Sequence, residues 1–98
     1  MSLRLVVVIT TQPGRGQEQV EAFARLAPLV RAEAGCLQYD LHSVGGDPDR
    51  FVLLEEWASR AELDAHGRSP HMVEAGAANG GLRAGPAQVM VLSATPLV

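Results

Sequence analysis

The most constraining feature of this chain is a run of nine residues near the N-terminus, Leu3–Thr11, in which β-branched side chains dominate. Apolar residues occupy both of its alternating faces, with Leu5, Val7 and Ile9 on one face and Val6 and Val8 on the other. A strand that is apolar on both faces is typical of the centre of a sheet that is covered on both sides. We therefore expect Leu3–Thr11 to be a central strand, ended by Pro13-Gly14.

The next two segments predict a helix followed by a hairpin. Apolar residues recur at helical spacing over Gln17–Ala34, with Pro28 inside the helix and Gly35 placed to close it. Cys36–Ser43 alternates as a half-buried edge strand, with Leu37, Tyr39 and Leu41 on its apolar face. A turn at Gly45–Asp49 leads into a further strand, Phe51–Trp57.

The C-terminal part predicts two short helices and a last strand. Ser59 and Glu62 form a capping box for a helix that runs to about His66. Ser69 and Pro70 are typical of the cap and first position of a second helix. That helix runs to about Ala78 and is followed by a Gly-rich loop, Asn79–Pro86, and a strand, Ala87–Thr95.

The order of these elements is β-α-β-β-α-β, which predicts one α+β domain over residues 1–98 with a ferredoxin-like arrangement. Two helices cover one face of such a sheet, and the first and last strands leave the other face apolar. Packing two sheets face to face would bury that surface. We therefore expect a homodimer.

Composition excludes several classes of function. The chain has 8 Lys and Arg against 11 Asp and Glu, so a basic surface for nucleic acid is not expected. No apolar run reaches the roughly 18 residues of a membrane span, and the N-terminus does not resemble a signal peptide. A single cysteine, Cys36, excludes an internal disulfide. We expect a cytoplasmic protein with an unreactive thiol.

Three histidines, His42, His66 and His71, are candidates for acid–base chemistry near neutral pH. The break at Gly67–Pro70 could turn His66 and His71 toward one cleft, although both also suit surface or capping positions. His42 lies on the polar face of the edge strand, where a structural role is favoured.

Metal and phosphate motifs are absent. There is no HExxH, and although His66, His71 and Glu74 could be written as a two-histidine, one-carboxylate set, their spacing does not favour a metal. The glycines of residues 79–85 match no phosphate-binding loop. We expect neither a metal nor another cofactor.

The strand Phe51–Trp57 carries two candidate site residues. By alternation Glu55 shares a face with Leu53 and Trp57, so its carboxylate needs a partner. Glu55 is then either a base with a shifted pKa or half of a structural hydrogen bond or ion pair. Trp57 could stack on an aromatic ligand or pack in the core, and Tyr39 offers the same choice more weakly.

Four stretches together resemble the antibiotic-biosynthesis monooxygenase family, the small dimeric α+β barrels. They are Glu33–Tyr39 (EAGCLQY), Phe51–Trp57 (FVLLEEW), Leu63–His66 (LDAH) and Ser69–His71 (SPH). The resemblance implies a ferredoxin-like subunit, a dimer whose sheets close into a barrel, and a pocket between sheet and helices. It also implies enzymes that oxidise electron-rich phenols or quinols with O₂ and without a cofactor.

Within this resemblance Glu55, Trp57, His66 and His71 match the family's usual glutamate, tryptophan and histidines. Leu53 and Leu63 depart from the polyketide-oxidising branch, which has Asn and Tyr at these places, and they imply a more apolar pocket. The haem-degrading branch has Trp where His66 stands and Asn in its first strand, so haem degradation is not expected.

Our leading hypothesis is a cofactor-independent monooxygenase acting on a small aromatic substrate. Trp57 would stack on the ring, His66 or His71 would accept the phenolic proton, and Glu55 would orient a histidine, while Tyr39, Leu53 and Leu63 complete the substrate site. The alternatives are a non-oxidative, isomerase-like enzyme in the same pocket and a protein that only binds its ligand.

Overall fold

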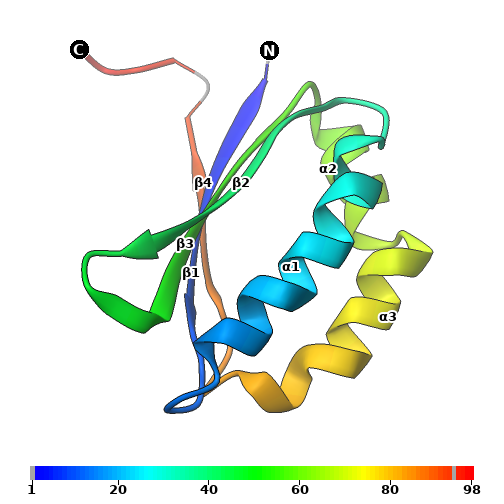
Figure 1. The fold of residues 1–98 in the computed structure, drawn as a ribbon. Helices are drawn as coiled ribbons and strands as arrows, with labels where there is room; N and C mark the ends of the chain where they lie inside the picture. Colours follow the sequence, from blue (N-terminus) through cyan, green and yellow to red (C-terminus); the bar gives the residue numbers. More distant parts are fainter. Residues whose placement is uncertain (1, 94) are drawn as a thin grey trace.

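A four-stranded antiparallel sheet forms one layer, and three helices pack on one of its faces (Figure 1). The computed structural model describes residues 2–93 and 95–98. The strands lie in the order β2-β3-β1-β4, which confirms the predicted ferredoxin-like topology. In chain order the elements are β1 (Leu3–Thr10), α1 (Gly16–Arg31), β2 (Cys36–Val44), β3 (Asp47–Trp57), α2 (Arg60–Gly67), α3 (Pro70–Asn79), a 3₁₀ turn (Gly80–Leu82) and β4 (Gln88–Leu92).

The N-terminal strand is central, as its sequence predicts. β1 pairs with β3 along its whole length and with β4 on its other side. Leu5, Val7 and Ile9 are buried under the helices, whereas Val6 and Val8 on the opposite face are only half-buried. The helical layer therefore covers one face of β1, whereas the second face is also apolar but has no layer of described residues packed on it.

The core lies between the sheet and α1. Phe23 and Val30 of α1 pack against Tyr39 of β2 and Phe51 of β3. Each of these residues is less than 8 % exposed. Their contacts hold the inner face of the sheet against α1.

The predicted boundaries shift at several elements. α1 ends at Arg31, and the following turn closes at Gly35, whose φ of +79° favours glycine. β2 carries a register shift between Cys36 and Gln38, so Leu37 is 59 % exposed although alternation placed it inside. The prediction for Leu37 is wrong because a bulge breaks the period of two.

The later elements also differ in extent. β3 begins at Asp47, four residues before the predicted start, and β4 ends at Leu92 and not at Thr95. Ser59 caps α2 as expected, since its hydroxyl accepts a hydrogen bond from the Glu62 backbone at 3.3 Å. Ser69 does not cap α3 with its side chain, because its hydroxyl donates instead to the His66 carbonyl at 2.8 Å.

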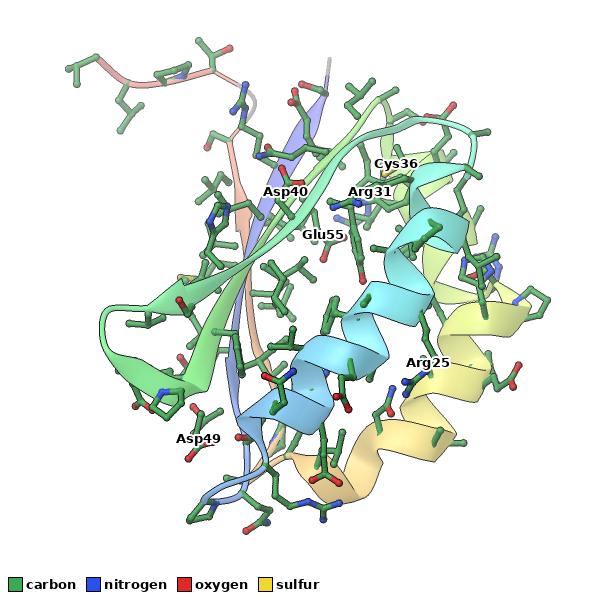
Figure 2. All side chains as sticks on the ribbon, in the orientation of Figure 1. Arg25, Arg31, Cys36, Asp40, Asp49 and Glu55 are labelled. Carbon is green, nitrogen blue, oxygen red and sulfur yellow. The ribbon has the colours of Figure 1, made fainter. Side chains whose placement is uncertain are left out.

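The start of α1 is fastened to β3 by Asp49 (Figure 2). The Asp49 carboxylate accepts hydrogen bonds of 2.9 Å from the backbone N–H groups of Gly14 and Gly16. The hydrogen bond from Gly14 is the main reason that the pKa of Asp49 lies below its ordinary value. This contact joins the first turn of α1 to the start of β3.

Across the described part of the chain, the helices are too short or too polar to span a lipid bilayer.

Candidate functional site

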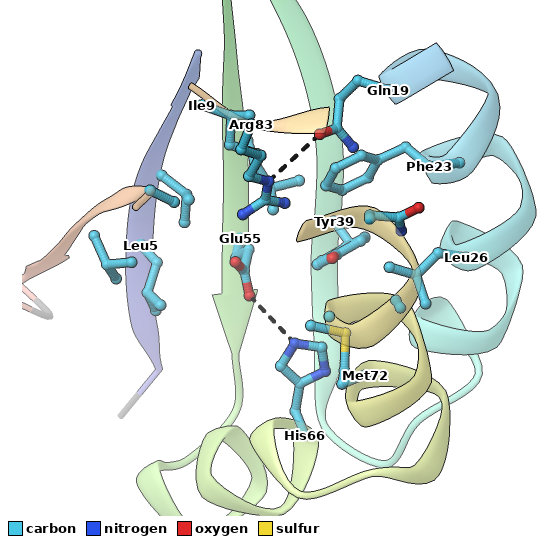
Figure 3. Close-up of a pocket in the computed structure, with 18 of the residues that line it drawn as sticks. Leu5, Ile9, Gln19, Phe23, Leu26, Tyr39, Glu55, His66, Met72 and Arg83 are labelled. Carbon is cyan, nitrogen blue, oxygen red and sulfur yellow. Dashed lines mark hydrogen bonds and ion pairs between the residues drawn. The ribbon is translucent and has the colours of Figure 1, made fainter. Parts of the chain in front are cut away.

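A cavity of about 320 Å³ opens between the sheet and the helices (Figure 3). Its walls are mainly apolar, and they come from every element that packs on the inner face of the sheet. Its apolar lining includes Leu5, Val7, Phe23, Leu53, Leu63 and Met72, and its polar lining includes Gln19, Tyr39, Glu55, His66, Asn79 and Arg83.

Glu55 brings a buried carboxylate to the sheet wall of the pocket (Figure 2). It faces inward because it alternates with Glu56 along β3, and it is 6 % exposed. The indole N–H of Trp57 donates to its Oε1 at 2.9 Å. Burial raises the pKa of Glu55, because the charged form loses the hydration it has in water.

His66 lies beside Glu55 in the wall of the pocket, and one of its ring nitrogens faces Glu55 while the other faces away from it. The last turn of α2 holds its ring, which is 4 % exposed, 4.5 Å from the indole of Trp57 between ring centres. Its Nε2 lies 4.0 Å from Oε1 of Glu55 (Figure 3). The two groups form a pair on the pocket wall that can exchange a proton with a bound ligand.

The second nitrogen of His66 points to a carboxylate that the sequence did not identify as functional. Oε2 of Glu33, in the turn after α1, lies 2.8 Å from Nδ1 of His66 and 2.8 Å from Nε2 of His71. Only one signal could have found Glu33, which is its place at the start of the EAGCLQY stretch. Its meeting with two histidines depends on how three separate segments pack.

This cluster is also where a metal would be sought. Among the residues that the structure describes, Glu33, His66 and His71 are the group whose ligand atoms lie within 4.8 Å of one another. The carboxylate thus comes from Glu33 and not from Glu74, which the sequence offered. The two separations of 2.8 Å are ordinary hydrogen-bond lengths, so we interpret the cluster as hydrogen-bonded.

The other predicted residues divide between the pocket and its surroundings. Tyr39, Leu53 and Leu63 line the cavity, and burial raises the pKa of Tyr39 so that its hydroxyl keeps its proton. Trp57 has no exposed surface and lies outside the lining, where it holds Glu55 and packs on His66. His71 lies behind the pocket, against Glu33.

The expectations for His42 and for Cys36 can be compared directly with the structure. His42 is exposed on β2, away from the lining of the pocket. The pKa of Cys36 is raised, first by burial and then by the negative charges of Glu33 and Glu55. A raised pKa disfavours the thiolate, which agrees with the expectation of an unreactive thiol.

Arg83 is a second polar group that the sequence did not identify. It lies in the segment between the 3₁₀ turn and β4, and its Nε donates to Oε1 of Gln19 at 3.4 Å. Figure 3 shows Glu55 between Arg83 and His66. Burial lowers the pKa of Arg83, yet a guanidinium remains charged at neutral pH. The pocket therefore offers a cation to an anionic oxygen.

Comparisons with known proteins agree with this fold. Residues 2–78 match the family model described as antibiotic biosynthesis monooxygenase. The probable quinol monooxygenase YgiN of Escherichia coli is 34 % identical over an aligned length of 82, and the match covers 71 % of this chain and 77 % of YgiN.

Solved structures give the same picture. PA3566 from Pseudomonas aeruginosa superimposes with a TM-score of 0.88 at 32 % identity, over 97 % of this chain and 95 % of that one. Rv0793 from Mycobacterium tuberculosis gives a TM-score of 0.88 at 29 % identity, over 98 % and 97 %. The family match and the names of the relatives support a function of the monooxygenase type. The chain belongs to the antibiotic biosynthesis monooxygenase family.

Proposed function

We propose that this protein is a cofactor-independent monooxygenase that oxidises a phenol- or quinol-type aromatic with O₂. The observation that carries the proposal is the pocket, in which apolar walls enclose about 320 Å³ beside the buried pair of Glu55 and His66. A cavity of that size and polarity suits one or two aromatic rings. The pair lies where the hydroxyl group of such a ring can give up its proton.

Proton removal is the step that the protein supports. The substrate hydroxyl gives its proton to Nε2 of His66, the ring nitrogen that faces Glu55 and the pocket. Glu55 orients the ring, and Trp57 fixes Glu55 through the hydrogen bond from its indole. His66 is thus our candidate for the base, and His71 lies behind it against Glu33. In this proposal Trp57 holds Glu55 from the core and does not stack on the substrate ring.

The resulting phenolate supplies the electrons for the reaction with O₂. One oxygen atom enters the ring and the other leaves as water. The inserted atom becomes the second carbonyl of a quinone when the substrate is a phenol, and the hydroxyl group of a hydroxyquinone when the substrate is a quinol. Arg83 lines the same cavity and stabilises the negative charge on the substrate oxygen. The apolar side chains of Leu53 and Leu63 exclude water from the anion.

We also propose that the active unit is a homodimer formed through the outer face of the sheet. Met90 and Leu92 of β4 pair with Val6 and Arg4 of β1, so they lie on the face opposite the helices. Met90 is 48 % exposed and Leu92 is 44 % exposed. Apolar surface of this kind on a sheet is covered when two sheets pack face to face.

One observation favours a second candidate. The proton-accepting pair on an apolar wall needs no oxygen to act, so Glu55 and His66 would also serve an isomerase that moves a proton on its substrate. Such an enzyme works equally well without air, which separates it from the oxygenase.

The first test measures oxygen uptake by chelator-treated protein with a panel of hydroquinones and polycyclic phenols. We expect uptake above the autoxidation blank with at least one substrate, and an oxidised product with one added oxygen atom by mass spectrometry. His66→Gln should lower kcat by about 100-fold or more, because it removes the base. His42→Gln, on the exposed face of β2, is the matched control and should keep full activity.

Other results would redirect the assignment. Turnover that continues without oxygen would favour the isomerase. Saturable binding of phenols with no product would identify a binding protein. A His66→Gln variant as active as the parent would exclude His66 as the base.

A further inference from the structure

We propose that Glu33 and His71 are positioning residues that control the protonation of His66, so that the pocket-side histidine is free to accept a proton from the substrate. The inference deepens the proposed function and rests on it for the role of His66. It starts from a geometric fact, since a single carboxylate oxygen, Oε2 of Glu33, lies 2.8 Å from one nitrogen of each ring.

The hydrogen bonds define what each nitrogen does. Glu33 as a carboxylate accepts from Nδ1–H of His66 and from Nε2–H of His71. His66 then has Nε2 without a hydrogen, and this nitrogen faces Glu55 in the pocket. Glu33 thus selects the tautomer in which the base is directed at the substrate, as second hydrogen-bond partners of histidine commonly do.

One carboxylate balances one positive charge, so the two rings compete for a single extra proton. The side chain of His71 is 21 % exposed, and that of His66 is 6 % exposed. In the proposed arrangement His71, whose ring reaches solvent, holds the extra proton, and His66 is the ring that is free to accept one from the substrate.

This arrangement allows the proton count to balance during the reaction. When His66 takes the substrate proton at Nε2, it becomes the cation next to Glu33. His71 can then release a proton from Nδ1 to solvent, so the cluster keeps one extra proton throughout. When the intermediate is protonated by His66, His71 takes a proton back from solvent. Glu33 remains a carboxylate at each stage.

The other groups around His66 leave Glu33 as its main counter-charge. Tyr39 of β2 packs edge-on against the ring, and burial raises its pKa, so it is neutral. The thiol of Cys36 is neutral for the same reason. Glu55 of β3 is 4.0 Å away, and burial moves it toward the protonated form. Arg83 lies beyond Glu55 and carries a constant charge.

His71→Gln tests the inference, because the glutamine amide can still donate a hydrogen bond to Glu33 but cannot hold the proton. With its competitor gone, Glu33 keeps His66 protonated to higher pH. The acidic limb of the profile of kcat/KM against pH should move up by about one pH unit. The position of the limb, and not the height of the plateau, is the readout. His42→Gln should leave the profile unchanged.

Glu33→Gln should shift the acidic limb in the opposite direction. Removing the carboxylate removes the charge that stabilises a protonated His66, so the ring loses its proton at lower pH. A structural role alone would lower activity in both variants at every pH, and it would not move the limb in opposite directions. The two shifts together are therefore the signature of the proposed control.

A measurement without turnover separates this inference from the proposed function. The chain has three histidines, so ring signals in protein labelled with ¹³C-histidine can be assigned by NMR with His42→Gln and His71→Gln. We expect the His66 signal to titrate at higher pH in His71→Gln and at lower pH in Glu33→Gln. These shifts without turnover of any substrate would overturn the oxygenase and leave the coupling standing. Turnover with an unshifted limb and an unshifted His66 signal would overturn the coupling alone.

Discussion

Glu55 is an ionisable residue that lies in the apolar layer of the fold, where a charged group costs stability, and it also belongs to the proposed site. Alternation along β3 places its carboxylate in the apolar layer, and the indole of Trp57 is the donor that satisfies Oε1. The pKa of Glu55 is raised, first because the group is buried. Holding an ionisable carboxyl group in apolar surroundings beside the proposed base has a cost in stability.

Glu55→Gln should therefore stabilise the protein at neutral and alkaline pH. Because the folded state binds this proton more tightly than the unfolded chain, the contribution of Glu55 to stability is fully present below about pH 4.5 and is lost as the pH rises through the raised pKa. Glutamine imitates the protonated form and keeps an acceptor for Trp57. We expect its free energy of unfolding, from urea denaturation, to exceed that of the parent by about 1 kcal/mol more at pH 8 than at pH 4.

Glu21→Gln on the exposed side of α1 is the control, and its difference from the parent should be the same at both pH values. A pH-independent difference for Glu55→Gln would mean that the folded and unfolded chains bind this proton equally.

At this scale the sequence predicts which side chains face the core but not every partner. Period-two alternation identifies Glu55 as inward-facing, and the break at Gly67–Pro70 indicates that His66 and His71 are neighbours. Glu33 was not assigned a role, because it lies in a turn, where no period applies. Its partners are 33 and 38 residues away, so only the packed structure brings them together.

Among the elements, the close approach of α1 to β3 depends on a residue without a side chain. A Cβ at Gly16 would lie 1.7 Å from the carbonyl oxygen of Pro48, which is backbone and cannot move aside cheaply. Asp49 holds the same two segments together through the N–H groups of Gly14 and Gly16. The first turn of α1 is therefore tightly constrained.

Gly16→Ala should destabilise the protein by about 2 kcal/mol, because β3 must shift to admit the methyl group. Gly76→Ala is the matched control, since Gly76 lies inside α3 and a Cβ added there would have no neighbour within 4 Å. There alanine should stabilise by about 0.5 kcal/mol through its higher helix propensity. Thermal unfolding of both variants should show shifts of opposite sign. Equal shifts would contradict the close approach.

Element order was predictable because each segment carries its own local signal. The capping box at Ser59 and Glu62 fixes the start of α2, and the apolar run of β1 fixes its central place. The register shift in β2 was not predictable, because it depends on pairing with β3 and not on the residues of β2 alone. Leu37 is exposed for that reason.

At the scale of the whole molecule, the fold of the described residues leaves the apolar outer face of the sheet uncovered. Met90→Glu should prevent the proposed dimer, because a charge placed there would be buried between two sheets. Sedimentation or light scattering should give about 10.4 kDa for this variant and twice that for the parent. Leu29→Glu, at a position 54 % exposed on α1, is the control and should remain dimeric. A monomeric parent would refute the dimer directly.

Different parts of the site come from different stretches of the chain, and this affects how such proteins can diverge. The groups that we propose to handle the proton, from Glu33 to His71, belong to one continuous stretch of 39 residues. Much of the wall that meets the rest of the ligand comes later, from Met72, Ala75, Ala87 and Val89. Substitutions at these four wall positions can therefore reshape the cavity while Glu33, Glu55, His66, His71 and Arg83 stay in place. Under the proposed function, a lineage could then acquire new aromatic substrates without first rebuilding the groups that carry out the reaction.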